Sequence, residues 1–319
     1  MHHALLLAVA AGLDLLLGDP RQLPHPVRAI GWCYARLDTL ADRLGWRGRL
    51  FGALSVAAVA GGSALVVAAA CALPAVGALL AVYFAYAGLA LGSLLAEGRR
   101  AARFLIAGDL EAARTAVGGL VSRDVAGLDA PELWRALAES VAENANDGFV
   151  APFFWLAVTG PAGLWAYKAV STADSMWGYR TPRHERLGWF GARADDVLAW
   201  LPARLTVAAL WLAARFLGAG RGVRLGDIAR DAAKSASPNA GWPMAAAAWL
   251  CGGSMGGLTR YHGALVDKPR LGPADCPWDA ARYGLLSAMV LFAGCIVAAG
   301  TIAIFGIRAW SVAWLLALS

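Results

Sequence analysis

Residues 50–96 read LFGALSVAAVAGGSALVVAAACAL-P-AVGALLAVYFAYAGLALGSLLA, two apolar stretches separated by Pro74. Neither stretch contains a charged residue, and each reaches the length of about 20 residues that a helix needs to cross a bilayer. Proline interrupts a helix because its ring clashes with the preceding turn. The sequence therefore predicts two membrane-spanning helices, Leu50–Leu73 and Ala75–Ala96, joined by a tight turn.

The rest of the chain follows the same pattern. Of its 319 residues, 59% are hydrophobic and 16% are charged, whereas soluble proteins contain about 25% charged residues. Gly284–Gly306 is long enough for a third span, and Ala4–Leu17 predicts a shorter helix. Three further apolar segments are short or interrupted by Pro, Gly or Arg, namely Val150–Val170, Val197–Gly218 and Pro243–Leu258. We expect an all-α, polytopic membrane bundle that forms one membrane-embedded catalytic domain over residues 1–319.

Lysine and arginine are concentrated in five segments between the apolar stretches. The positive-inside rule places all five on the cytoplasmic side of the inner membrane; they are 18–49, 97–148, 171–196, 219–242 and 259–283. If 150–170 and 197–218 each crossed the membrane once, the basic segment 171–196 between them would lie on the side of the membrane opposite to the other basic segments. We therefore expect at least one apolar segment between 150 and 258 to be re-entrant or interfacial, which is allowed where the backbone is buried in protein. The alternative is that some basic segments face the periplasm.

The segment 97–148 predicts a largely cytoplasmic helical region. Apolar and charged residues alternate at helical spacing between Ala101 and Ala116. Asp129 then stands two residues before Pro131, an arrangement typical of a helix N-terminus. A helix from this point through Glu143 is expected.

Residues 18–28 read GDPRQLPHPVR. The three prolines fix the backbone and prevent a helix, so Asp19, His25 and Arg28 are presented on a stiff loop beside a membrane helix. Such a loop suits a reactive site. A capped turn with a hydrogen-bonded histidine explains the same residues.

Residues 139–148 read ESVAENANDG. Glu139 and Glu143 are four positions apart and share one helix face, and we expect residues 146–148 to end that helix. Carboxylates at the entrance to the membrane are costly unless cations or a metal ion compensate them. One or two of them, together with substrate phosphate, would suffice for Mg²⁺. The alternative is a solvated acidic face followed by a helix stop.

Residues 167–180 read YKAVSTADSMWGYR. Lys168 is surrounded by apolar residues, so its ammonium group must reach the membrane surface or bind an anion. Asp174 lies six positions later and could pair with it, and the small hydroxyl residues with Gly178 would let a phosphate approach closely. The alternative is a snorkelling Lys168 with Asp174 as a capping residue.

Residues 192–196 read ARADD. Adjacent carboxylates repel each other unless one is protonated or both meet cations, and Arg193 and Arg204 are the candidate partners of Asp195 and Asp196. One of the two aspartates could instead cap the following helix.

Residues 237–243 read SPNAGWP. Two prolines bracket an asparagine and a glycine, which predicts a rigid turn. A helix of small residues follows, and its N-terminus could bind an anion. This motif is weak by itself because many turns have the same composition.

Taken in order, the five segments resemble the adenosylcobinamide-phosphate synthase family of cobalamin biosynthesis. That family shows the patterns L-D-x-x-x-G-D-P…P-H-P-V-R, E-N-x-x-D-G-x-x-A-P, Y-K-A-x-[NS]-T-x-D-S-M-x-G-Y, A-R-x-D-D and S-P-N-A-G-x-P. The matching segments are Leu13 to Arg28, Glu143 to Pro152, Tyr167 to Tyr179, Ala192 to Asp196 and Ser237 to Pro243. Ser171, Ala236 and residues 261–263 depart from the pattern, so no role is predicted for the side chains at 171, 236 and 262.

The resemblance implies a membrane ligase that joins a propionate carboxylate of adenosylcobyric acid to the amine of an amino-alcohol phosphate, such as aminopropanol phosphate. The product would be adenosylcobinamide phosphate, with ATP as co-substrate and Mg²⁺ as cofactor. The implied catalytic residues are Asp19, His25, Glu143, Lys168 and Asp174. The implied substrate- and phosphate-binding residues are Arg28, Asn144, Thr172, Ser175, Tyr179, Arg180, Arg193, Ser237 and Asn239. The implied metal ligands are Glu139, Glu143, Asp147, Asp195 and Asp196.

Membrane lipid is a further expected partner and nucleic acid is not, while a homo-oligomer or a complex with other enzymes of the pathway stays open. A corrinoid or small-molecule transporter would also have broken helices and intramembrane charge, but the two halves of the chain contain no corresponding pair of broken segments. A membrane phosphotransferase or prenyltransferase would use Asp-rich motifs, but neither Asp147 nor Asp195-Asp196 has the D-x-x-x-D spacing. The chain contains no Walker A loop, so a nucleotide site would have to be assembled from separate segments.

Overall fold

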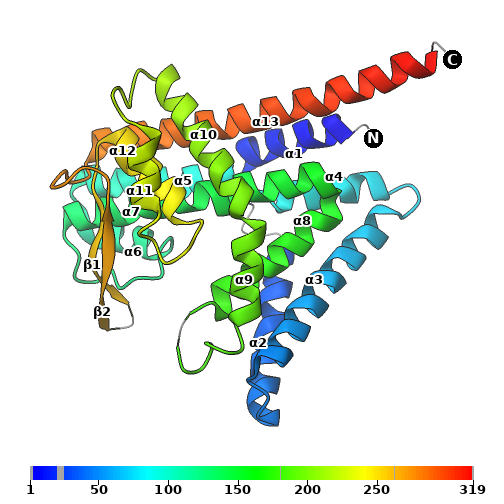
Figure 1. Cartoon of the computed structure of the whole chain (residues 1–319), viewed down its shortest axis with the longest axis horizontal. Helices are drawn as coiled ribbons and strands as arrows, with labels where there is room; N and C mark the ends of the chain where they lie inside the picture. The colour runs from blue at the N-terminus through cyan, green and yellow to red at the C-terminus, as the bar shows by residue number, and fades with distance from the viewer. Residues whose placement is uncertain (1–2, 20–24, 180, 262, 318–319) are drawn as a thin grey trace. The chain divides into compact units, whose positions relative to one another are not determined.

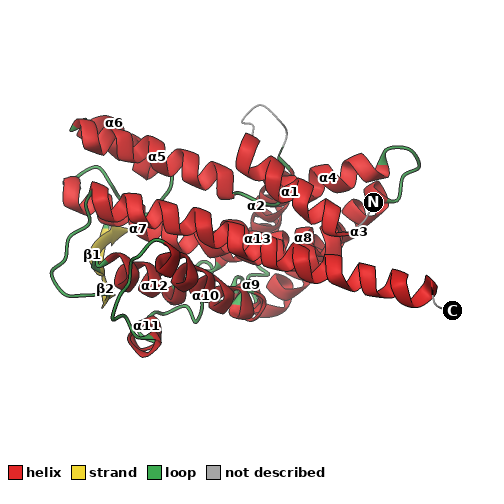
Figure 2. Cartoon of the chain, turned by 90° about the horizontal axis from the view of Figure 1, so that it is seen from above, coloured by secondary structure: helices red, strands yellow, loops and turns green. Residues whose placement is uncertain are grey.

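The computed structural model describes residues 3–19, 25–179, 181–261 and 263–317. The chain divides into two compact units. Figure 1 labels the helices and strands along the chain, and Figure 2 colours them by type. Unit 1 comprises Met1–Ala90, Ala151–Ala199 and Ala298–Ser319, and unit 2 comprises Leu91–Val150 and Trp200–Val297. The helices are α1 (His3–Leu17), α2 (Pro26–Leu44), α3 (Arg49–Cys71), α4 (Gly77–Ala87), α5 (Leu91–Ala107), α6 (Leu110–Gly118), α7 (Ala130–Asn144), the π-helical η1 (Ala145–Val150), α8 (Ala151–Trp177), α9 (Trp189–Leu198), α10 (Trp200–Phe216), α11 (Leu225–Ala232), α12 (Gly241–Cys251) and α13 (Ala280–Ala317).

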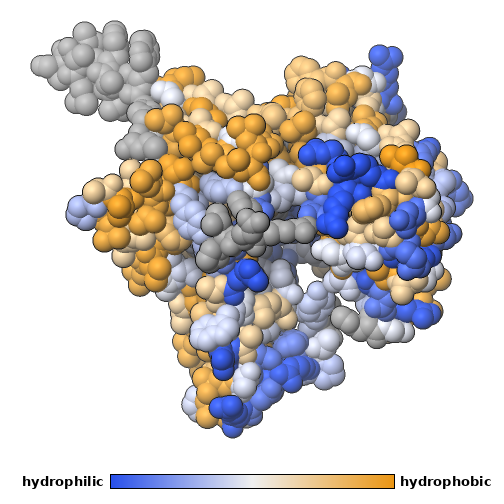
Figure 3. All heavy atoms as spheres, turned by 180° about the vertical axis from the view of Figure 1, so that it is seen from behind, coloured by the Kyte–Doolittle hydropathy of each residue, from blue (hydrophilic) through white to orange (hydrophobic). Residues whose placement is uncertain are grey.

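Within the described residues, four helices are long and apolar enough to cross a membrane, namely Arg49–Cys71, Gly77–Ala107, Ala130–Trp177 and Ala280–Ile307. The three spans expected from the sequence are thereby confirmed, and the chain is an all-α, multi-pass membrane protein. Figure 3 shows broad hydrophobic areas on one face of the molecule. Leu50 and Leu65 on α3 are 73% and 72% exposed, as expected for side chains that face lipid.

The apolar segments between residues 150 and 258 are interrupted, as expected. α9 and α10 are together long and apolar enough for either one broken span or a re-entrant loop. α12 has 11 residues and is too short to cross a bilayer as a helix. The expectation that at least one of these segments is re-entrant or interfacial stays a prediction. The side of the membrane on which the basic segments lie stays a prediction.

The hairpin of α3 and α4 forms in unit 1 at the expected position. Pro74 lies in the turn, Ala75 has a φ of 63°, and the Gly77 N–H donates to the Leu73 carbonyl oxygen at 2.9 Å. α3 packs along α8, and α8 also contacts α2 and α9. The unit is thus assembled around α8.

A kink divides α8 at Gly160, whose φ of 70° lies in the left-handed region. The next residue, Pro161, has no N–H, so the carbonyl of Ala157, four positions earlier, lacks its usual helical donor. The Nε2 atom of His3 on α1 lies 2.8 Å from this carbonyl oxygen. Because a carbonyl only accepts, His3 donates the missing hydrogen bond, and α1 is joined to the kink.

In unit 2, α7 starts at the N-cap that the sequence predicts. The Asp129 carboxylate accepts a hydrogen bond from the Glu132 N–H at 2.9 Å, and the Glu132 carboxylate accepts one from the Asp129 N–H at 3.0 Å. The prediction that residues 146–148 end this helix is wrong, because they lie in η1 and the helical path continues into α8. Such π-helical turns are frequent at functional sites.

A β-hairpin of β1 (Met255–Tyr261) and β2 (Ala264–Leu271) is also part of unit 2, and it was not predicted. The sequence favoured an apolar segment that continues to Leu258, whereas α12 ends at Cys251. Gly256 and Gly257 have φ values of 82° and 85°, which a helix cannot accommodate. A Cβ atom at Gly256 would also overlap the backbone of Pro269 on β2.

The packing of α3 in unit 1 can be tested at Gly52, where a Cβ atom would overlap the carbonyl group of Leu187. We expect Gly52→Ala to lower the free energy of unfolding by about 1–3 kcal/mol, as overpacking does. The midpoint of thermal unfolding in detergent, followed by tryptophan fluorescence, should fall accordingly. Gly61→Ala on the same helix is the matched control, since nothing lies within 4 Å of its Cβ position. Equal midpoints for the two variants would contradict this packing.

Candidate functional site

Three of the five motifs lie on helices that pack together in unit 1. The first motif ends in the first turn of α2, the third lies mostly on α8 and the fourth on α9, and α8 contacts both α2 and α9. The Tyr34 hydroxyl on α2 donates to the Ala169 carbonyl oxygen on α8 at 3.0 Å. A Cβ atom at Gly191 on α9 would lie 3.2 Å from the Cβ of Ala173. The third motif thus lies between the other two.

His25 caps the N-terminus of α2. Its Nδ1 atom accepts a hydrogen bond from the Val27 N–H at 3.2 Å, and its Nε2 atom lies 3.6 Å from the Asp19 carboxylate. A neutral ring with Nδ1 as acceptor carries its proton on Nε2. The Nδ1 lone pair is therefore used by the Val27 N–H, and the Nε2 side of the ring faces Asp19. Arg28, one turn into α2, is exposed.

The residues of the third motif lie on α8 or directly after it. The hydroxyls of Thr172 and Ser175 donate to the carbonyl oxygens of Lys168 and Ser171 at 2.7 and 2.9 Å, which leaves their lone pairs available. Lys168 and Asp174 are about one and two-thirds turns apart, so their side chains leave the helix in different directions. This geometry disfavours the direct pair that the sequence suggested.

The third motif ends in a loop. Tyr179 is 46% exposed there, and Arg180 lies outside the residues that the structure describes.

The fourth motif lies within a helix. Asp195 and Asp196 are inside α9, so the interpretation that one of them caps the following helix is wrong. Arg193 lies 3.5 Å from the Asp196 carboxylate, as expected. Arg204, the other candidate partner, instead donates to Asn239 Oδ1 at 2.8 Å.

Two of the motifs lie on elements of unit 2 that contact each other. α7 and η1 carry the second motif and α12 follows the fifth, while α10 contacts both η1 and α12. Glu139 is buried on α7, where it forms an ion pair with Arg123 and accepts a hydrogen bond from the Gly256 N–H at 2.7 Å. Glu139 therefore joins α7 to the segment before α7 and to β1.

Glu143 lies one helical turn beyond Glu139 and is partly exposed. On the neighbouring residue, the Asn144 amide donates to the Ser140 carbonyl oxygen at 2.9 Å, so its amide oxygen is available to a ligand. The predicted shared face of Glu139 and Glu143 is confirmed, but the two carboxylates have different surroundings.

A chain of hydrogen bonds orients Asp147 in η1. The Thr206 hydroxyl on α10 lies 3.1 Å from Asn146 Oδ1, and the Asn146 amide donates to Asp147 Oδ1 at 2.7 Å. Thr206 and Asn146 are both buried. The π-helical turn is thereby fastened to α10, and one oxygen of Asp147 is held in a fixed direction.

The fifth motif forms the rigid turn that the sequence predicts. The Ser237 hydroxyl oxygen accepts hydrogen bonds from the N–H groups of Asn239 and Ala240, both at 3.2 Å. Asn239 is buried and accepts the hydrogen bond from Arg204. Both predicted phosphate-binding side chains are thus engaged in holding the turn and α10 together.

The predicted metal ligands divide between the units. Among the described residues, no three His, Cys, Asp or Glu side chains lie close enough together to hold a metal ion. Glu139 fits a metal poorly because an arginine already neutralises it. Glu143 and Asp147 in unit 2, and Asp195 and Asp196 in unit 1, fit better, since Mg²⁺ needs only one or two carboxylates when phosphate and water complete its shell.

Sequence reasoning missed four residues that hold these motifs in place, namely Arg123, Asn146, Arg204 and Thr206. Arg204 was considered only as an aspartate partner. A polar side chain within an apolar helix indicates a residue with a specific partner. Thr206 and Arg204 on α10 could have been identified by this signal. Arg123 gave no such signal, because it lies among other charged residues of the 97–148 segment.

The buried pair in unit 2 gives a test of whether Glu139 acts in structure or as a metal ligand. The side chains of Glu139 and Arg123 are 5% and 7% exposed. We expect Glu139→Gln to lower the free energy of unfolding by about 3–5 kcal/mol, because it leaves a buried cation without its anion. Glu111→Gln is the control, since its pair with Arg114 involves a carboxylate that is 89% exposed and should contribute less than about 1 kcal/mol.

The unfolding of both variants should be measured in detergent with and without excess Mg²⁺. The decrease in the free energy of unfolding caused by Glu139→Gln should be the same with and without Mg²⁺. A loss that occurs only when Mg²⁺ is present would instead assign Glu139 to a metal site.

Comparison with known proteins places the chain in a family. Residues 7–290 match the family model described as CobD/Cbib protein. The chain is 40% identical over 282 residues to the cobalamin biosynthesis protein CobD of Pelobacter propionicus, covering 87% of each chain. It is 40% identical over 322 residues to the protein of that name from Rhodobacter capsulatus, covering 98% of this chain and 100% of that one.

The protein of the same name from Mycobacterium tuberculosis is 38% identical over 290 residues, covering 90% of this chain and 91% of that one. No solved structure matches the chain. The resemblance carried by the five motifs is confirmed at the level of the family: the chain belongs to the CobD/Cbib family, and the three relatives named here are cobalamin biosynthesis proteins.

Proposed function

We propose that this protein acts in cobalamin biosynthesis as an ATP-dependent ligase, joining an amino-alcohol phosphate to a propionate carboxylate of adenosylcobyric acid. The observation that carries the proposal is the ordered set of five ligase-type motifs in a chain that belongs to a family of cobalamin biosynthesis proteins. The multi-pass architecture offers helix ends at the membrane surface, which suits a large amphipathic corrinoid. The family names give no support to the transporter alternative.

The proposed chemistry has two steps because a carboxylate is a poor electrophile. A carboxylate oxygen attacks the γ-phosphorus of ATP, ADP leaves, and an acyl phosphate forms. The amine nitrogen then attacks the acyl carbon, inorganic phosphate leaves, and the nitrogen loses one proton. Phosphoryl transfer of this kind depends mainly on positioning and on neutralisation of the phosphate charge.

In unit 1, Lys168, Arg28 and Arg193 are proposed to neutralise phosphate charge. Asp19 is proposed to take the amine proton, with the His25 ring fixing the position of the carboxylate through its Nε2 side. The hydroxyls of the third motif keep their lone pairs available and would orient a substrate N–H or O–H group. The exposure of Arg28 and Arg193 suits contact with a ligand that arrives from the aqueous side.

In unit 2, Glu143 and Asp147 are the carboxylates proposed to hold Mg²⁺, which when bound would neutralise phosphate oxygens. The hydrogen bonds from Thr206 to Asn146 and from Asn146 to Asp147 fix one carboxylate oxygen before any ligand arrives. Preorganisation of this kind is what makes charge stabilisation effective in a site.

The reaction is tested by incubating the purified protein with adenosylcobyric acid, ATP, Mg²⁺ and either aminopropanol phosphate or ethanolamine phosphate. Mass spectrometry should detect the amide product, with ADP and phosphate in equal amounts. Asp174 is an implied catalytic residue of the third motif, and we propose that it acts in acid–base catalysis, so Asp174→Asn is expected to reduce the rate by about 100-fold or more. Full activity in this variant would remove Asp174 from the catalytic residues.

Asp267→Asn is the matched control, because Asp267 lies exposed on β2 outside the motifs. Its rate should equal that of the wild type, and both variants should keep the wild-type unfolding midpoint. Turnover of ATP with no amide product under any substrate combination would contradict the ligase proposal.

The active side is proposed to face the cytoplasm across the inner membrane, since all five basic segments would then obey the positive-inside rule. Arg186 and Arg221 are exposed in two of these segments. We expect single-cysteine variants Arg186→Cys and Arg221→Cys, in a background with the five native cysteines replaced by serine, to resist a membrane-impermeant thiol reagent in intact cells. Both should react after the cells are opened, and a control cysteine at Leu73 in the α3–α4 turn should react in intact cells. Labelling at residue 186 or 221 in intact cells would contradict this orientation.

A further inference from the structure

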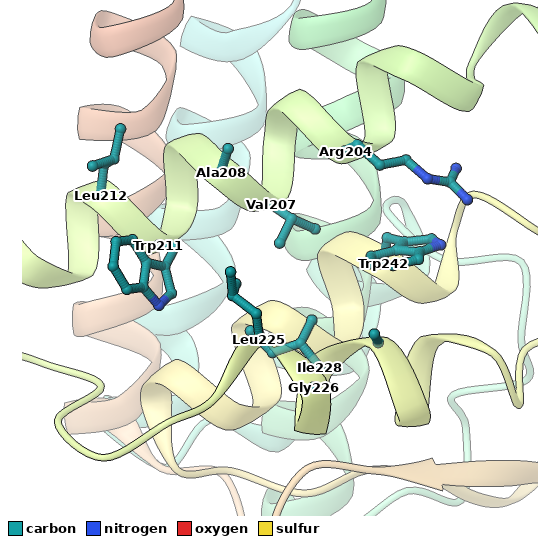
Figure 4. A pocket seen from close by; sticks show the side chains of 10 residues that line it. Arg204, Val207, Ala208, Trp211, Leu212, Leu225, Gly226, Ile228 and Trp242 are labelled. Carbon is teal, nitrogen blue, oxygen red and sulfur yellow. The ribbon is translucent and has the colours of Figure 1, made fainter.

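A cleft of about 620 Å³ lies between α10, α11 and α12 in unit 2 (Figure 4). Its volume is in the range of ligand sites. Its walls are almost entirely apolar, and Arg204 is the only charged side chain that lines it. The apolar walls include Val207, Trp211 and Leu212 from α10, and Leu225 and Ile228 from α11.

Arg204 is held in a fixed position at one end of this cleft. Its guanidinium lies over the rings of Trp200 and Trp242, at 4.6 and 4.7 Å from the ring centroids. Its Nη1 atom donates to the Trp200 carbonyl oxygen and to Asn239 Oδ1, at 2.9 and 2.8 Å. Figure 4 shows Arg204 and Trp242 side by side at the same end of the cleft.

The charge of Arg204 is not neutralised by the protein. Among the described residues, no carboxylate forms an ion pair with Arg204, and both of its hydrogen bonds are donated by Nη1. The side chain is partly exposed, so an anion that enters the cleft meets its unpaired charge. The two stacked rings and the asparagine hold the group ready for a planar, two-point contact with phosphate or carboxylate.

The opposite wall of the cleft is fixed by Asp231. Its buried carboxylate accepts hydrogen bonds from Lys234 Nζ at 2.6 Å, from Trp249 Nε1 at 2.9 Å and from the Gly272 N–H at 2.8 Å. Burial alone would raise the pKa of Asp231, but these donors outweigh it and keep the pKa below its usual value. α11 is therefore fastened to α12 and to Gly272, the residue that follows β2.

The surroundings of the cleft indicate lipid. α10 belongs to the broken apolar pair α9–α10 and exposes Leu212 by 42% and Phe216 by 75%. Trp200, beside Arg204, is 53% exposed, and tryptophan with arginine is typical of the level of the lipid headgroups. A nucleotide would find no polar lining for its base or ribose, whereas an acyl chain needs none.

From the single uncompensated arginine and the apolar walls, we propose that this cleft binds one membrane phospholipid, with its phosphate on Arg204 and an acyl chain between α10 and α11. The lipid supplies the missing anion and covers the apolar walls. This site goes beyond the ligase reaction and does not rest on it.

Native mass spectrometry of the full chain, purified in detergent and titrated with dioleoylphosphatidylglycerol, tests the proposal. Wild type should bind one molecule more tightly than the rest. Arg204→Gln should weaken this first site by about tenfold or more, and Ala229→Trp should abolish it by filling the cleft, of which Ala229 is a lining residue. If the unfolding midpoint shows that Arg204→Gln does not fold, Ala229→Trp still tests whether the cleft binds lipid, because it leaves every charge in place.

Arg215→Gln is the matched control. Arg215 is on the same helix and lies over a tryptophan ring at 4.6 Å, but it does not line the cleft. Its lipid binding should equal that of the wild type. Equal weakening by Arg204→Gln and Arg215→Gln, or unchanged binding in Ala229→Trp, would overturn the site.

Parallel titrations with inorganic phosphate and with ATP, neither carrying an acyl chain, distinguish the sources of phosphate. Displacement of the first lipid by either at stoichiometric concentration would show that the site serves a soluble phosphate compound instead. A dimer that appears in the mass spectrum when the lipid dissociates would show that a second copy of the chain covers the apolar walls. Both outcomes contradict the lipid site, whatever the result of the ligase assay.

Discussion

A polar group inside an apolar helix must find a partner, and this constraint determines much of the structure. The cost of an unpartnered charge in the membrane is several kcal per mole by any measure. In unit 2, Glu139 and Asp147 meet it in different ways. Glu139 pairs with Arg123, and Asp147 is reached through Asn146 and Thr206. These contacts join helices that apolar packing alone would leave free to slide.

The same constraint explains which parts of the fold could be predicted. Local signals were sufficient for the hairpin at Pro74 and the N-cap at Asp129, because proline and a capping carboxylate act within one turn. They were not sufficient for η1, where residues 146–148 have the composition of a helix end. There the Asn146 side chain contacts Thr206, which lies 60 positions away in the sequence. The hairpin after Cys251 also depends on a distant contact, the approach of Gly256 to Pro269.

For the candidate site, the sequence identified the side chains with suitable chemistry but not their surroundings. Glu139 and Glu143 look alike in the sequence, yet one is neutralised by an arginine and the other is partly exposed. His25 looked like a base, but the Val27 N–H occupies its acceptor nitrogen. The role of such a side chain depends on its hydrogen-bond and ion-pair partners. Some of these partners are distant in the sequence, and some occupy the atom that was expected to react, so residue types alone do not reveal them.

The contact between His3 and the kink in α8 has a consequence for assembly during synthesis. The two partners are separated by 154 positions, so the donor leaves the ribosome long before its acceptor exists. Until α8 is in place, α1 lacks this attachment, and the carbonyl of Ala157 has no helical donor because Pro161 cannot supply one. α1 also contacts α4, which precedes α8 in the chain, so the bond from His3 adds an attachment to α8 that forms only after residues 151–177 have been made.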